Sequence, residues 1–157
     1  MAITVTNAQG TKVYIADLGT SVSTATAIET AISGGDAIGC IQELGSISTS
    51  RSVNEYSCLS SDETAKSLGS LSLGNLNVQL LFDATDTAGQ DALRGMYSAN
   101  VGKLFIVELN DDGGTNPSYF TFNGAISSEE IAVAKDSAVM YNVTLEINSV
   151  PEYTSAA

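Results

Sequence analysis

Hydrophobic and polar residues alternate along two segments, 75–80 and 138–149, as they do in β-strands that bury one face. Successive side chains of a strand point to opposite faces of the sheet, so the pattern predicts one face in the core and one in water. We expect Pro151 to end the second strand, because proline cannot donate a ladder hydrogen bond. The apolar positions are Leu76, Val78 and Leu80 in the first segment and Val139, Tyr141, Val143, Leu145 and Ile147 in the second.

Shorter segments rich in β-branched and aromatic residues, bounded by turn-forming residues, predict further strands. These are 3–6 and 12–15, joined by a turn at 7–10, then 38–44, 52–56, 104–107 and 119–122, the last two joined by a hairpin tip at 110–114. The segment 127–133 starts like a helix capping box, but its apolar residues alternate with Ala as in a strand. The residues alone leave helix and strand open there.

One segment, 86–99, predicts a helix that carries an apolar stripe. It begins at Asp86 or Thr87, where Thr87 and Gln90 have the spacing of a capping box, and Asn100 and Gly102 follow it as stop signals. The segment 19–35 is rich in Ser, Thr and Ala and predicts a connector with at most one short helix. The expected core face of the main helix consists of Ala92, Leu93, Met96 and Tyr97.

A long polar segment, 57–72, lies between the extended residues 52–56 and the strand at 75–80. It is too polar to bury and longer than an ordinary hairpin loop, and loops of that length often carry function. We therefore expect a contact arm here. Its candidate contact residues are Ser57, Leu59, Ser60, Ser61, Asp62, Glu63, Thr64, Lys66 and Leu68.

The composition excludes several classes of function. With 157 residues the chain fits a single domain, 1–157, and its net charge of −12 makes tight wrapping of DNA unfavourable. No histidine is present, which excludes Ser-His-Asp and Cys-His enzymes. No segment has the pattern of a signal peptide or a membrane span, so we expect a soluble protein made in a cytoplasm. Cys40 and Cys58 lack CxxC spacing, which favours buried free thiols over a disulfide or a redox site.

The motifs that could carry chemistry are weak. The segment 111–114 suggests a calcium loop but lacks the spacing and final Glu of one, and no glycine pattern forms a phosphate-binding loop. The carboxylate pairs at 62–63 and 129–130 lie in Ser-rich segments where nothing would raise a pKa for acid–base work. We predict no catalytic, metal or cofactor site and therefore no enzyme.

The polar faces of the predicted strands remain, and they have two interpretations. They are either the ordinary water-facing side of a β-sandwich or the wall of an aqueous channel. The residues do not distinguish the two, since both surfaces have the same composition.

The order of elements, from polar arm through alternating strand, helix, strand and hairpin to a final strand, resembles the major tail tube proteins of long, non-contractile-tailed, lambda-like bacteriophages. The resemblance runs over roughly 37–153. It rests on the segments 52–59, 74–82, 89–97, 119–128 and 143–147.

This resemblance implies a mainly β fold: a β-sandwich or open barrel with one flanking helix, related to the tubes of contractile tails and type VI secretion systems. It implies that 131–133 is a strand, and that subunits form stacked hexameric rings whose strands join into one inter-subunit β-barrel around a DNA channel. The arm at 57–72 would reach a neighbouring subunit or ring. No immunoglobulin-like C-terminal domain is expected. The candidate lumen-lining residues are Glu43, Asn54, Asn75, Asn77, Gln79, Asn142, Thr144 and Glu146.

The same resemblance implies the partners and the location. The partners would be further copies of the chain, the tape measure protein, the tail tip or initiator complex and the tail terminator, with phage DNA passing unbound and no membrane contact. The location would be the virion tail, after assembly in the host bacterial cytoplasm. An alternative function class is a monomeric β-sandwich or β-barrel that binds a ligand in an internal pocket. An enzyme is the least favoured class.

Overall fold

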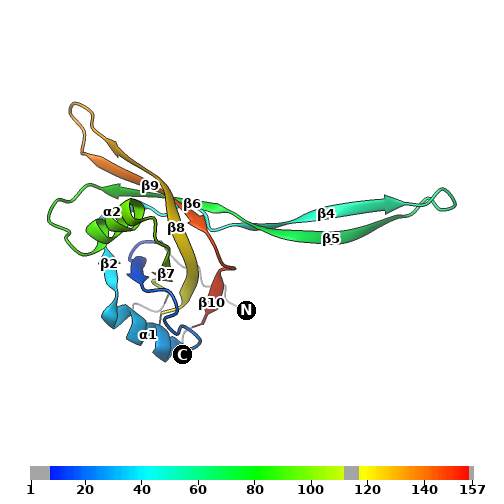
Figure 1. Cartoon of the computed structure of the whole chain (residues 1–157), viewed down its shortest axis with the longest axis horizontal. Helices are drawn as coiled ribbons and strands as arrows, with labels where there is room; N and C mark the ends of the chain where they lie inside the picture. Colours follow the sequence, from blue (N-terminus) through cyan, green and yellow to red (C-terminus); the bar gives the residue numbers. More distant parts are fainter. Residues whose placement is uncertain (1–7, 112–116, 156–157) are drawn as a thin grey trace.

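The computed structural model describes residues 8–111 and 117–155, and it is mainly β (Figure 1). Ten strands and two helices occur in these residues. In chain order they are β1 (Lys12–Ala16), α1 (Ala25–Gly34), β2 (Asp36–Ile38), β3 (Ile41–Glu43), β4 (Thr49–Ser57), β5 (Thr64–Leu73), β6 (Asn75–Leu81), α2 (Gly89–Ala99), β7 (Lys103–Glu108), β8 (Tyr119–Ala132), β9 (Met140–Ile147) and β10 (Glu152–Thr154).

Eight of these strands form one antiparallel sheet that curls almost into a barrel. The order is β2-β1-β7-β8-β9-β6-β3, and β10 pairs with β8 beside it. The two edge strands, β2 and β3, are consecutive in the chain and are joined through Gly39 and Cys40 alone. The sheet must therefore curl until its edges meet. The remaining strands, β4 and β5, form a separate two-stranded ribbon.

The main core fills the inside of this curled sheet. The buried residues of β6 and β9 predicted from alternation lie in it, beside Phe105 and Phe122, whose rings stack with centroids 5.6 Å apart. A second cluster lies on the outer side of β7, where Leu104 and Ile106 pack against Ile28 of α1. Strand β7 is thus buried on both faces, which explains its continuous apolar sequence.

The predicted strand at 38–44 is wrong as one element. It is divided into β2 and β3 at Cys40, which has a positive φ of 60°. That left-handed conformation turns the chain from one sheet edge to the other, and the carbonyl of Cys40 accepts a hydrogen bond from the Leu81 amide at 2.9 Å. The local apolar pattern carried no sign of this break.

Both cysteines are free thiols, but the prediction that they are buried is wrong. Cys40 is exposed at the turn between β2 and β3, and Cys58 is exposed at the end of the β4–β5 ribbon. Their small apolar side chains therefore contribute nothing to the core.

Two helices flank the sheet: the main helix predicted at 86–99 and the short helix allowed in the connector 19–35. The short helix in the connector is α1, which Thr24 caps by accepting a hydrogen bond from the Ala27 amide at 3.2 Å. Helix α2 starts at Gly89, three residues later than the earliest predicted start. Its first amides donate to the carboxylate of Asp86, from Gly89 at 2.9 Å and from Gln90 at 3.3 Å.

The predicted capping box of Thr87 and Gln90 is therefore wrong, because Gln90 is fully buried and turns to the sheet instead. Its amide group donates to the carbonyl of Leu81 at 2.8 Å and accepts from the amide of Asp83 at 3.1 Å. A second, longer bond reaches the carbonyl of Gly39 at 3.4 Å. One side chain thus ties α2 to the end of β6 and to the turn between the edge strands.

Replacing Gln90 with Leu should lower the free energy of unfolding by about 1–3 kcal/mol, because the Leu81 carbonyl and the Asp83 amide lose their partner. Urea denaturation measures the loss. The control is Gln79→Leu, at an exposed position of β6, where no buried backbone group loses a bond. Equal stability of Gln90→Leu and the wild-type protein would refute a structural role for this side chain.

The remaining predictions divide between confirmed and untested ones. The segment 127–133, left open by the residues, belongs mostly to β8, which runs to Ala132 as the family resemblance implies. Strand β10 follows Pro151 and was not predicted. The first strand of the expected hairpin at 3–6 and most of the tip at 110–114 lie outside the described residues.

Candidate functional site

A polar face covers four neighbouring strands of the curled sheet, β3, β6, β9 and β8. The register places its residues in rows across the strands, because side chains on one face recur at every second position. The rows are Glu43, Gln79, Asn142 and Glu130, then Asn77, Thr144 and Ser128, then Asn75 and Glu146. Seven of the eight lumen candidates thus lie on one surface.

The eighth candidate, Asn54, does not belong to this surface. It lies on β4, in the ribbon that projects from the sheet, opposite Ser67 of β5. Its polarity matches that of the other seven, but its strand belongs to a different sheet. Asn54 is therefore removed from the set, and "polar sheet face" below means the rows named above.

Hydrogen bonding on the polar sheet face is incomplete in one place. Thr144 donates to the Asn77 side-chain oxygen at 3.0 Å, across the β6–β9 pair. The side-chain oxygen of Asn142, by contrast, is buried and has no hydrogen-bond partner among the described residues. A buried unpaired acceptor is costly, so this position is the one where an added donor would be most favourable.

A tyrosine anchors the outer part of the same strands. The hydroxyl of Tyr141 donates to a carboxylate oxygen of Glu129 at 2.7 Å. Burial and this carboxylate raise the pKa of Tyr141 well above its usual range, so the hydroxyl stays protonated and remains a hydrogen-bond donor. The bond joins Tyr141 of β9, a buried residue of the main core, to Glu129 in the outer part of β8.

One edge of this extension is unpaired. Strand β8 pairs with β7 only as far as Gly124, whereas it pairs with β9 as far as Ala132. On the β7 side, residues 125–132 have no strand neighbour in the described part of the chain. An exposed ladder edge of this length is a template for a strand from another chain.

The arm predicted at 57–72 exists, but it is not a loop. It is a hairpin of β4 and β5, connected by residues 58–63, and it projects far from the curled sheet (Figure 1). Neither strand packs extensively on any described element except the other. The prediction failed because strands with no core to pack against need no apolar majority, so their sequence resembles a loop.

The two faces of this arm differ. Beyond an irregularity between Arg51 and Val53, the register places Val53 opposite Leu68 on one face, followed by the ion pair of Lys66 and Glu55 at 3.0 Å. The same face carries leucines near the base, opposite Thr49 and Arg51. We call Val53, Leu68 and Leu71 the apolar arm face, whereas Leu73, at the base of the arm, packs against the main core.

The opposite arm face is polar over most of its length. It carries Ser50 opposite Ser72 and Asn54 opposite Ser67, with Tyr56 farther out. Of the candidate contact residues, Thr64, Lys66 and Leu68 are in β5, Ser57 ends β4, and Leu59, Ser60, Ser61, Asp62 and Glu63 are in the exposed connection. Val53 and Leu71 were missed, although their alternation with Ser and Asn was a signal for a two-faced strand.

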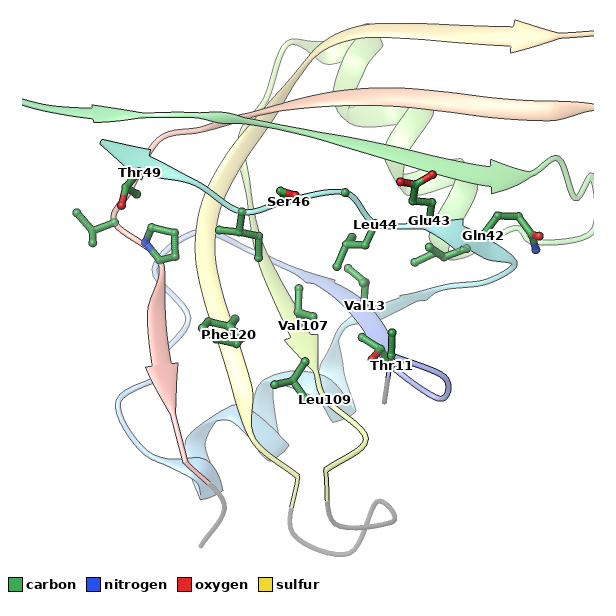
Figure 2. Close-up of a pocket in the computed structure, with 16 residues that line it drawn as sticks. Thr11, Val13, Gln42, Glu43, Leu44, Ser46, Thr49, Val107, Leu109 and Phe120 are labelled. Carbon is green, nitrogen blue, oxygen red and sulfur yellow. The ribbon is translucent and has the colours of Figure 1, made fainter. Parts of the chain in front are cut away.

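An apolar groove opens at one end of the curled sheet (Figure 2). Its volume is about 830 Å³, and segments from five parts of the chain line it. The apolar lining includes Ile41, Leu44, Ile47, Leu109, Phe120 and Val150. Glu43 is the single ionisable side chain among the described residues that line it, so the groove offers no nucleophile with a neighbouring base.

The expected core face of α2 is partly wrong. Leu93 and Met96 are buried and Ala92 is half-buried, but Tyr97 is 42% exposed, whereas Gly89 and Gln90 are buried in its place. Among the described residues no group of His, Cys, Asp and Glu side chains could hold a metal ion. None of the described helices is long and apolar enough to cross a membrane.

No protein-family model and no curated protein sequence matches the chain. Solved structures match its fold. The SPP1 tail tube matches with a TM-score of 0.67 and 14% identity, covering 98% of this chain and 80% of that one. A chain in the sheath/tube terminator structure of the PVC extracellular contractile injection system matches with 0.71 and 12%, covering 98% and 99%. The tail of a gene transfer agent particle matches with 0.64 and 15%, covering 96% and 100%. The fold is thus that of tail tube proteins.

Proposed function

We propose that this chain is a structural subunit of a tail tube, without enzymatic activity. The observation that carries the proposal is the projecting arm: a β-hairpin that beyond its base packs extensively on no other described element, attached to a body with the tail tube fold. A ribbon of two strands alone is marginal in water, so its natural role is to pack on another molecule. In a tube that molecule is a neighbouring copy.

The unpaired edge of β8 supports a ring. A strand edge at 125–132 invites pairing with the next subunit, and pairing that closes on itself removes every exposed edge. The same rotation repeated around an axis gives a ring, and the family resemblance favours six subunits for it. Stacking of such rings through the arms gives a tube.

The polar sheet face would line the channel. Its ionisable groups are the carboxylates Glu43, Glu130 and Glu146, and its remaining members are uncharged, so it would repel DNA phosphates. Repulsion of this kind lets DNA slide past with few persistent contacts. The tape measure protein would fill the channel before DNA, and an initiator and a terminator complex would cap the two ends in the host cytoplasm.

The purified protein at high concentration should form rings or hollow tubes, seen by negative-stain electron microscopy beside light scattering of the same sample. The second candidate, a monomeric binding module, is favoured by the groove of about 830 Å³, which is the size of a small-molecule pocket. A strict monomer that binds a small apolar molecule in this groove would replace the tube proposal.

The placement of the channel wall has its own test. In a variant without native thiols (Cys40→Ser and Cys58→Ser), Asn77→Cys should react in assembled tubes with a small maleimide but at least tenfold more slowly with a protein-sized one. The unassembled variant is the control and should react with both, since Asn77 is exposed. Rapid reaction of tubes with the large reagent would place the polar sheet face outside.

A further inference from the structure

Two apolar surfaces of the chain have no partner in the described residues. The first is the apolar arm face, on which the side chains of Val53 and Leu68 are 53% and 71% exposed. The second is the groove, where Leu44, Ile47 and Phe120 are only partly buried. Exposed apolar surface of this kind marks a site of contact with another molecule.

Only the base of the arm, at Thr49, lines the groove of its own chain, and the rest of the arm runs away from it. β4 and β5 continue the pairing of the segments at the arm base, where the Gly74 amide donates to the Ser48 carbonyl at 3.1 Å. From this base the ribbon runs outward for the length of β4, about 30 Å for nine residues (Figure 1). Folding back would break the continuous ribbon, so its partner must be another molecule.

Charge favours a second copy as this partner. The arm, 49–73, holds two cations and three carboxylates, whereas the rest of the chain holds four cations and fifteen carboxylates. Two bodies therefore repel each other, and the nearly neutral arm is the segment that approaches an acidic body at little electrostatic cost.

The arm also carries a cation on the same side as the apolar arm face. Arg51 lies opposite Leu71, beside the apolar arm face, and makes no ion pair with any described residue. At the groove, Glu43 borders one side from the rim of the polar sheet face, and Glu152 follows the lining residue Pro151 on another. Neither carboxylate forms an ion pair in the described part of the chain. An apolar surface with one free cation thus matches an apolar groove with acidic margins.

We infer that the apolar arm face of one copy packs into the groove of another copy, with Arg51 toward the acidic margin. This inference rests on the proposed tube function and names the surfaces that join its subunits. Because each copy contributes one arm and one groove, the contact is heterologous. Each added copy leaves a free arm at one end of the assembly and a free groove at the other, so the contact can repeat from copy to copy.

A pair of neighbouring arm residues on opposite faces provides the matched test. In the thiol-free variant, protein carrying Leu68→Cys is mixed with tagged protein carrying Ser46→Cys at the groove, and the mixture is concentrated and oxidised. The tagged disulfide product should form at least tenfold more than with Ser67→Cys, whose side chain is on the polar arm face. Equal yields from the two arm positions would overturn the inference.

A charge added to either face gives an independent measure. Val53→Asp should lower the assembled fraction at least tenfold, whereas Asn54→Asp, which adds the same charge on the polar face, should leave it within about twofold. Unchanged melting of both variants shows that their bodies are folded. Equal effects of the two substitutions would contradict packing by one face.

The outcomes separate the inference from the tube function. Tubes without the Leu68–Ser46 product overturn the contact alone, and the product without tubes overturns the tube alone. A groove filled by the chain's own residues 1–7, or by a small apolar molecule, would also leave no product and would overturn the contact.

Discussion

Replacing residues 52–70 with Asn-Gly, so that the paired residues Arg51 and Leu71 are joined by a tight turn, should abolish tubes and leave the body folded. The arm is the element that projects from the body, and none of the replaced residues 52–70 is part of the core. Their removal therefore deletes the proposed intermolecular surface at almost no cost within the chain. We expect the free energy of unfolding to change by less than about 1 kcal/mol, as for surface changes generally.

The measurement is electron microscopy of wild-type and shortened protein at equal concentration, beside thermal unfolding of both. The control shortens only the tip: Ser57 and Thr64, which are paired, are joined through Asn-Gly. This variant keeps both arm faces and should still assemble, since it loses only the connection 58–63. Normal tubes from the 52–70 replacement would remove the arm from the assembly mechanism.

Leu93→Ala should lower the free energy of unfolding by about 2–5 kcal/mol, the range for truncating a buried leucine. Leu93 is 1% exposed and joins α2 to the main core, in which Val13, Ile38 and Phe105 also lie. The truncation leaves a cavity between helix and sheet that the curled strands cannot readily fill, because both sheet edges are fixed at Gly39 and Cys40.

Denaturant unfolding of Leu93→Ala is compared with that of Tyr97→Ala, on the same helix. Tyr97 is 42% exposed, so its truncation should cost clearly less than that of Leu93. If Tyr97→Ala lowered the free energy of unfolding as much as Leu93→Ala does, Tyr97 would belong to the core face of α2, as the sequence predicts.

The strands with one buried face could be predicted because their pattern depends on local geometry alone. β6 and β9 alternate with period two, and this period also placed six lumen candidates on the polar sides of these two strands, which the register then joins into one surface. Asn54 lies apart from the other candidates because polarity does not tell which sheet a strand joins.

The predictions that failed depend on partners distant in the chain. Gln90 has the spacing of a capping residue, but its side chain hydrogen-bonds the carbonyl of Leu81 and the amide of Asp83 instead. These two backbone groups would otherwise lack this partner. The break at Cys40 follows from the closing of the sheet, which no local pattern encodes. The groove is lined by five parts of the chain, so no local pattern in the sequence reveals it.

The pairing of β1 with β7 has a consequence for how the protein folds. Lys12 lies opposite Glu108, so this pair joins the two halves of the chain and must close a very long loop. Sheets dominated by such distant pairs fold in roughly milliseconds to seconds, whereas a local hairpin such as β4–β5 forms in about 1–10 μs. During synthesis the arm can therefore form while the sheet is still incomplete. A newly made subunit would therefore present its arm before its groove has formed.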